Sequence, residues 1–173
     1  MQTATYTNGH ATNGRLMPAR RVTPLVASRW AYGQDRSFAM VGAAVQTLER
    51  SGETWSPLHS AGSPITWATT VAELVAGGEY DGIVLFCEDP AMATLIANKT
   101  PGVRAAAVST VNQAARATLT IAANLLAVEM PGRTFFEIRH ILHLVRESPL
   151  LCPAQLASVI SEREHDANRR GDR

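Results

Sequence analysis

The sequence predicts an α/β fold: a three-layer, doubly wound, Rossmann-like sandwich with a five-stranded parallel sheet. Two observations support this prediction. Short apolar runs alternate with amphipathic segments along the chain, which is typical of a parallel sheet with helices on both faces. The clearest unit is Tyr80–Ala107, where an apolar run, an acidic loop, a helix and a tight turn lead into a second apolar run.

The elements are expected to follow one another as five strand–helix pairs and one additional helix. Apolar runs predict the strands, and apolar residues at helical spacing predict the helices. The expected strands are Val22–Ala27, Trp55–Leu58, Ile83–Phe86, the run that ends at Ala107, and Asn124–Val128. The expected helices are Asp35–Arg50, Thr66–Val75, a segment that begins at Pro90, Gln113–Ala122, Thr134–Val145 and Ala154–Glu164.

Helix ends are marked by residues that interrupt helices. Ser51-Gly52, Gly77-Gly78 and Ser148-Pro149 each follow an amphipathic stretch. Thr134–Val145 carries more apolar side chains than one face of a monomer's helix requires. Part of this helix is therefore expected to be buried against another subunit.

The chain is expected to form one domain, residues 21–164, between a disordered leader, residues 1–20, and a flexible tail, residues 165–173. The leader is rich in Thr, Asn and Gly without an apolar period. A net charge of +1 gives no field that would attract nucleic acid or an anionic membrane. No apolar run approaches the roughly 18–20 residues of a membrane span, and no apolar signal core is present. A cytoplasmic protein is expected, with neither nucleic acid nor a membrane as partner.

The loop Cys87-Glu88-Asp89-Pro90 is the strongest candidate site. It follows a buried strand, and ligands of open α/β sheets bind beyond the carboxyl ends of strands. Cys87, Glu88 and Asp89 are therefore candidate catalytic residues for proton transfer. In the alternative interpretation, Cys87 is an inert core thiol and Asp89 caps the following helix, with Pro90 at its first position. Two adjacent carboxylates would raise the pKa of the thiol and repel an anionic ligand.

Several pieces of the sequence fall in register with one known family. They are Cys87, Ala97-Asn98-Lys99, Pro101-Gly102-Val103-Arg104-Ala105-Ala106 and Ala123-Asn124-Leu125-Leu126. Together they resemble the ribose-5-phosphate isomerase B and galactose-6-phosphate isomerase family. The resemblance implies a five-stranded parallel sheet, interconversion of aldose and ketose phosphates through an enediolate, and a site shared between subunits of a dimer or tetramer. It also suggests that Asn98, Lys99 and Arg104 contribute to substrate binding.

The chain departs from the catalytic pattern that the resemblance implies. An Asp-His pair is expected after the first strand, where this sequence has Ser28–Tyr32. Glu88–Ala91 replaces a glycine-rich loop, Ala93 takes the place of a glutamate base, and Thr120 that of a ring-opening histidine. Leu151–Ser158 contains none of the expected phosphate-binding basic residues. These differences predict negligible isomerisation of ribose 5-phosphate.

Aromatic and histidine side chains add weaker candidates. Trp30 and Tyr32 are expected to follow the first strand, where they would form an aromatic platform for a ligand; core packing is the alternative. His140 and His143 share one face of a helix, but they lack a third ligand. We therefore expect neither a metal nor a cofactor.

Two classes of function remain open. In the first, the protein is a divergent enzyme that acts on a sugar or sugar-derived small molecule, with Cys87, Glu88 or Asp89 in proton transfer. In the second, it is a non-catalytic binding or regulatory subunit, a pseudoenzyme that partners an active paralogue, since galactose-6-phosphate isomerase works as two unlike chains.

Overall fold

A computed structural model describes residues 29–60 and 62–171. The expected leader and the expected strand Val22–Ala27 lie outside these residues. The described part contains β1 (Trp30–Gln34), β2 (Ser56–Leu58), β3 (Gly82–Cys87), β4 (Ala105–Val108) and β5 (Leu125–Glu129). Its helices are α1 (Ala39–Arg50), α2 (Pro64–Ala76), α3 (Pro90–Ala97), α4 (Val111–Ile121), α5 (Phe135–Glu147) and α6 (Ala154–Gly171).

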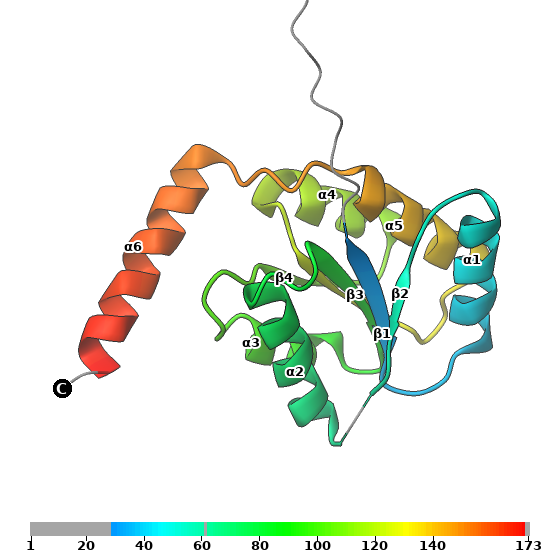
Figure 1. The fold of residues 1–173 in the computed structure, drawn as a ribbon, viewed down its shortest axis with the longest axis horizontal. Helices are drawn as coiled ribbons and strands as arrows, with labels where there is room; N and C mark the ends of the chain where they lie inside the picture. Colours follow the sequence, from blue (N-terminus) through cyan, green and yellow to red (C-terminus); the bar gives the residue numbers. More distant parts are fainter. Residues whose placement is uncertain (1–28, 61, 172–173) are drawn as a thin grey trace, which may run out of the picture.

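The strands form one parallel sheet in the order β2-β1-β3-β5-β4. Alternate side chains of a strand point to opposite faces, so β3 contributes to two apolar layers. Val84 and Phe86 pack with α1, α4 and α5, whereas Leu85 and Cys87 pack with α2 and α3. Helices therefore cover both faces (Figure 1), which confirms the predicted doubly wound fold with five parallel strands.

The first strand of the described sheet is not where the sequence predicted a strand. Trp30 and Tyr32 lie in β1 rather than after a strand. Trp30 is only 2% exposed, and it packs so closely on Gly82 that a Cβ there would lie 2.5 Å from the indole ring. Trp30 is thus a core residue, which argues against the predicted aromatic platform. The residues that follow the strand are Asp35 and Arg36.

The two last helices also differ from expectation. The buried side chains of α5, Ile138, Ile141, Leu142 and Val145, belong to the core shared with α1 and α4. Phe136 alone of the large apolar residues on α5 remains strongly exposed, at 72%. Most of the apolar surface that predicted a subunit interface is therefore used within the chain.

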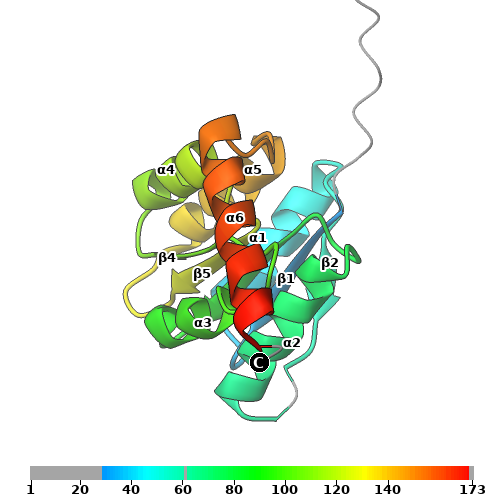
Figure 2. The same ribbon diagram turned by 90° about the vertical axis from the view of Figure 1, so that its left-hand side faces the viewer.

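The last helix stands apart from the sandwich, beside β4 (Figures 1 and 2). It was expected over Ala154–Glu164, but it continues to Gly171, so that most of the expected tail is helical. A hydrogen bond of 2.8 Å from the Gly102 amide to Glu164 Oε1 connects it to the turn before β4. None of the helices in the described residues is long and apolar enough to cross a membrane.

Candidate functional site

The carboxyl ends of β1 and β3 meet at the switch point of the sheet. The chain leaves β1 for β2 on one side and returns to β3 on the other, and this is where doubly wound sheets bind their ligands. A cavity of about 150 Å³ lies here. We call it the switch-point cavity; its lining includes Asp35, Trp67, Leu85, Cys87, Glu88 and Asp89.

Asp35 connects the two strand ends. Its amide donates a hydrogen bond to the Phe86 carbonyl at 3.1 Å, which continues the pairing of β1 with β3. Its Oδ2 accepts a hydrogen bond of 2.8 Å from the Glu88 amide. Its Oδ1 is buried and has no hydrogen-bond partner among the described residues. Asp35 is therefore a lining residue of the cavity with one unused acceptor.

Glu88 lies at the exposed rim of the cavity. Its carboxylate pairs with the Arg36 guanidinium, and both side chains are more than half exposed. The same guanidinium lies 5.1 Å from the centre of the Phe38 ring. Because exposed ion pairs contribute little stability, this pair orients Glu88 more than it holds the fold together.

Cys87 ends β3 and is 4% exposed. Burial, followed by the charges of Asp35, Asp89 and Glu129, raises the pKa of the thiol from its usual 9.0 to about 12. A thiol with such a pKa is neutral at pH 7, and the thiolate is the reactive form. The environment thus opposes the use of Cys87 as a base or nucleophile.

Asp89 caps α3, as predicted. Its Oδ1 accepts a hydrogen bond of 2.9 Å from the Met92 amide, and Pro90 occupies the first turn. Local sequence alone positions this cap, because a short polar side chain before proline is a typical helix start. The first turn of α3 is therefore already satisfied by a carboxylate of the chain itself.

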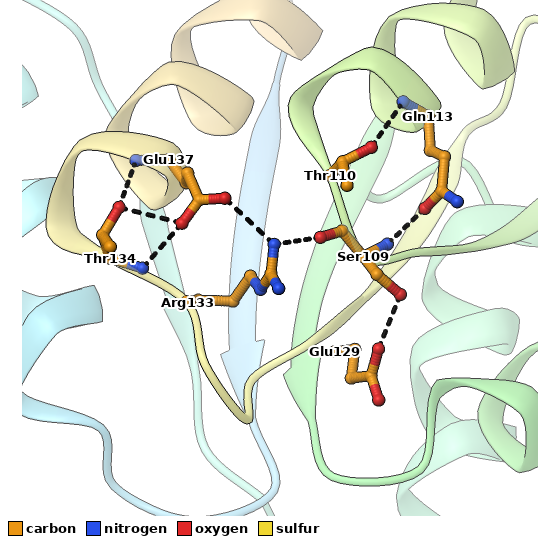
Figure 3. A network of polar contacts seen from close by, with 7 residues as sticks. All are labelled: Ser109, Thr110, Gln113, Glu129, Arg133, Thr134 and Glu137. Carbon is orange, nitrogen blue, oxygen red and sulfur yellow. Dashed lines mark hydrogen bonds and ion pairs between the residues drawn. The ribbon is translucent and has the colours of Figure 1, made fainter.

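A polar network joins the ends of β4 and β5 to the start of α5 (Figure 3). Ser109 Oγ donates a hydrogen bond of 2.6 Å to Glu129 Oε2. Arg133 donates to the Ser109 carbonyl and, at 3.0 Å, to Glu137 Oε1. Hydrogen bonds from the backbone and side chain of Thr134 lower the pKa of Glu137. Glu129 stands opposite Cys87 in the sheet register, so Asp35, Glu88, Asp89 and Glu129 together form an acidic carboxyl edge of the sheet.

The family model described as ribose/galactose isomerase matches residues 60–147, half of the chain. The chain belongs to this family.

Solved structures of the family share the fold. Type B ribose 5-phosphate isomerase from Trypanosoma cruzi is 26% identical, with a TM-score of 0.67 over 83% of this chain and 99% of that one. The Thermotoga maritima enzyme is 18% identical, with a TM-score of 0.66 over 78% and 96%. The Mycoplasma genitalium enzyme, with bound ribulose-5-phosphate, is 20% identical, with a TM-score of 0.66 over 79% and 96%. No curated protein matches the sequence significantly.

Family membership makes the position after the first strand important. The sequence predicted this position at Ser28–Tyr32, and the prediction was wrong, because β1 ends at Gln34. Asp35 therefore takes the position expected for the aspartate of the family's Asp-His pair, and Arg36 takes that of the histidine. Asp35 could have been found from the sequence only if β1 had been placed correctly.

The other residues of the family pattern lie at the opposite edge of the sheet. Asn98 follows α3, and Arg104 precedes β4, so both are at the amino ends of the strands. The Asn98 side chain bonds to both backbone groups of Ala105, and Arg104 Nε donates to the Ile121 and Ala122 carbonyls. Lys99 and Arg104 line a groove of about 680 Å³ beside α6, the α6 groove. One chain does not bring these residues together with Cys87, and their role in binding stays a prediction.

The histidines of α5 lie on a different surface. His143 Nδ1 is 2.7 Å from Glu53 Oε1, and His140 lines the same open cavity of about 450 Å³. Within residues 29–60 and 62–171, no three His, Cys, Asp or Glu side chains are arranged to hold a metal ion.

Proposed function

We propose that this chain is a divergent, isomerase-like protein of carbohydrate metabolism that acts on or binds a sugar-derived small molecule in the switch-point cavity. The observation that carries the proposal is the cavity itself, since it lies at the switch point of a sugar-phosphate isomerase fold and contains hydrogen-bonding groups. We expect negligible isomerisation of ribose 5-phosphate.

The charge of the cavity supports this expectation. Asp35, Glu88 and Asp89 line it, and of these three only Glu88 has a cationic ion-pair partner within the described residues. An incoming phosphate would meet like charge at short range. It would also find the first turn of α3 capped by Asp89, where a helix start could otherwise bind an anion.

If the protein is an enzyme, a carboxylate is its base. Aldose–ketose isomerisation needs a base that removes a proton from the carbon beside a carbonyl group. Cys87 is a neutral thiol at pH 7. Asp89 caps α3 and Glu88 pairs with Arg36, whereas Asp35 has an unused oxygen. Asp35 is therefore the best-placed base, and Glu88 and Asp89 remain candidates.

A non-catalytic binding or regulatory subunit is the second candidate function. In an isomerase, free backbone amides would stabilise the enediolate as an oxyanion hole. Here Pro90 has no amide hydrogen and the Met92 amide is bound by Asp89. Such a pseudoenzyme would form an oligomer with an active paralogue, as its non-catalytic subunit.

Assembly and location complete the proposal. Leu151, just before α6, is 82% exposed and Val159, on α6, is 52% exposed. A second copy would cover these apolar side chains, so we propose a homodimer or tetramer. The cytoplasm suits the free thiols Cys87 and Cys152. Light scattering should show an oligomer that Val159→Glu weakens; a strict monomer at micromolar concentration would reject this part.

The function is tested by activity and binding together. The purified protein is assayed for conversion of ribose 5-phosphate and galactose 6-phosphate, and sugars, sugar phosphates and nucleosides are screened by thermal shift. We expect at least one sugar-derived compound to raise the melting temperature and no ordinary rate of ribose 5-phosphate isomerisation. Conversion of ribose 5-phosphate at an ordinary enzymatic rate, or no stabilisation by any sugar compound, would overturn the proposal.

A further inference from the structure

Two residues that line the switch-point cavity each carry a buried polar atom with no hydrogen-bond partner within the described residues: Asp35 Oδ1 and Trp67 Nε1. Trp67 is 4% exposed, so its indole N–H is shielded from bulk water. Buried polar groups in folded proteins are nearly always satisfied. Two unsatisfied atoms on residues that line one cavity are therefore the basis for seeking a ligand group that bonds to them.

Both side chains are held in place by neighbouring backbone, that of β1 for Trp67 and that of Glu88 for Asp35. A Cβ on Gly33 would lie 2.7 Å from Trp67 Cζ2, so the indole packs directly on this glycine. Asp35 directly follows β1, and its amide donates to the Phe86 carbonyl of β3. Its Oδ2 is already bound by the Glu88 amide. The donor and the acceptor are therefore positioned before any ligand arrives.

The chemistry of the two atoms selects the ligand group. A carboxylate oxygen only accepts hydrogen bonds, and an indole nitrogen only donates. A hydroxyl group can satisfy both kinds of atom, because it donates and accepts. A phosphate dianion has no hydrogen for Asp35, and an ammonium group has no acceptor for Trp67. The acidic rim of Glu88 and Asp89 acts further against phosphate.

The size and walls of the cavity agree with a small polyol. Its volume of about 150 Å³ corresponds to roughly five water molecules at ~30 Å³ each. Leu85, Met92 and Ala93 contribute apolar walls for C–H groups. This space takes a few hydroxylated carbon atoms at one end of a ligand.

We infer that the switch-point cavity binds the hydroxylated end of a neutral, unphosphorylated sugar or polyol, in which hydroxyl groups donate to Asp35 Oδ1 and accept from Trp67 Nε1–H. This inference rests on the proposed function, because it names the substrate class of the same site. The inferred ligand differs from the family's phosphorylated substrates in its charge.

Matched pairs of ligands test the inference. Calorimetry on the full chain compares ribose with ribose 5-phosphate and galactose with galactose 6-phosphate, with ribitol as an open-chain polyol and galactosamine as a cation. We expect the unphosphorylated member of each pair to bind at least tenfold more tightly, and galactosamine to bind no better than galactose. Tighter binding of the phosphates or of galactosamine would overturn the inference but leave the proposed function intact. Absence of binding by every compound would overturn both.

Two substitutions test the assigned atoms. Asp35→Asn replaces the carboxylate, and Trp67→Phe removes the indole N–H while keeping an aromatic ring. Each should weaken binding of the preferred unphosphorylated compound at least tenfold without lowering the melting temperature of the ligand-free protein by more than a few degrees. Trp30→Phe is the matched control, because the Trp30 Nε1 is also buried without a partner in the described chain but lies in the opposite core layer. Unchanged affinity in both site variants, or an equal loss in Trp30→Phe, would overturn the inference.

Discussion

The carboxyl and amino edges of the parallel sheet satisfy their polar groups in different ways. At the amino edge, the buried Asn124 side chain accepts from the Arg104 amide at 2.7 Å and donates to the Gly102 carbonyl at 2.9 Å, while Asn98 serves Ala105 in the same manner. At the carboxyl edge, acidic side chains gather around a neutral thiol, and one carboxylate oxygen stays unused.

This difference shows which part of the molecule the family resemblance describes. The Ala-Asn-Lys, Pro-Gly-Val-Arg and Ala-Asn pieces are all at the amino edge, where their side chains hold backbone turns. The departures at Arg36, Glu88–Ala91 and Ala93 are at the carboxyl edge, where ligands bind, whereas those at Thr120 and Leu151–Ser158 are not. The shared motifs therefore explain the shared fold better than they predict a shared reaction.

The largest expected effect concerns Cys87 and the acidity of the carboxyl edge. With a pKa of about 12 instead of 9.0, its thiolate fraction at pH 8 is about a thousandfold below that of an ordinary thiol. We expect Cys87 to react far more slowly than Cys152 with an uncharged alkylating reagent, as measured by mass spectrometry at pH 7–9. Asp35→Asn should speed alkylation of Cys87 and leave Cys152 unchanged; fast alkylation of Cys87 in the native protein would contradict the acidic edge.

The same pKa has a consequence for stability against pH. The folded-state pKa lies above the usual value, so the neutral buried thiol stabilises the fold up to about pH 9. This contribution is lost as the pH rises from about 9 towards 12. The free energies of unfolding by urea of the native protein and of Cys87→Ala should therefore become more similar as the pH rises through this range, since alanine has no proton to lose.

Asn124→Ala tests the amino edge. It would leave the Arg104 amide and the Gly102 carbonyl without their partners in a position that is 8% exposed. We expect a loss of about 3 kcal/mol in the free energy of unfolding by urea. The exposed Asn112, on α4, is the matched control, and its change to Ala should cost less than about 0.5 kcal/mol. Equal losses in the two variants would remove the distinction between the edges.

A smaller effect is expected for Asp89→Ala. It removes the cap of α3, so the free energy of unfolding should fall by about 1 kcal/mol. Asp89→Asn keeps a capping oxygen and should recover most of this loss in the same urea titration. A loss as large as that of Asn124→Ala would show that both edges of the sheet contribute equally to stability, which would contradict the difference between them.

The smallest effect is expected for Glu88→Gln. The Arg36–Glu88 pair is exposed on both sides, and such pairs contribute about 0–1 kcal/mol. Stability should change by less than about 0.5 kcal/mol, whereas turnover of an identified substrate would fall if Glu88 were the base. Chemical unfolding and a substrate assay on one preparation separate these two roles.

Most of the fold followed from local patterns, and β1, which was not predicted, shows where they fail. Helices such as α5 have an apolar period that their own sequence reveals. β1 contains Gly33 and Gln34, and it is a strand because β2 and β3 pair with both of its sides. Such pairing joins residues far apart in the chain, so the β-branched segment Val22–Ala27 was the more persuasive candidate from sequence alone.

In the candidate site, too, features that depend on neighbouring residues were predictable, and features that depend on distant residues were not. The Asp89 cap was predictable because a cap involves only neighbouring residues. Asp35 was missed with its strand, and the Ser109–Glu129 bond joins two loops that no spacing in the sequence connects. The family pattern named Asn98 and Arg104 as substrate-binding residues, but it did not show that their side chains bond to the backbone of the same chain.

Because Trp67 packs on Gly33, the residue at position 33 of β1 affects the size of the ligand site. Any side chain at position 33 would force the indole to move, because its Cβ would come within 2.7 Å of the ring. Trp67 is also a wall of the switch-point cavity. A change at Gly33 would therefore reshape the site without altering any residue in its lining, so this glycine offers a means of redesigning which molecule the protein accepts.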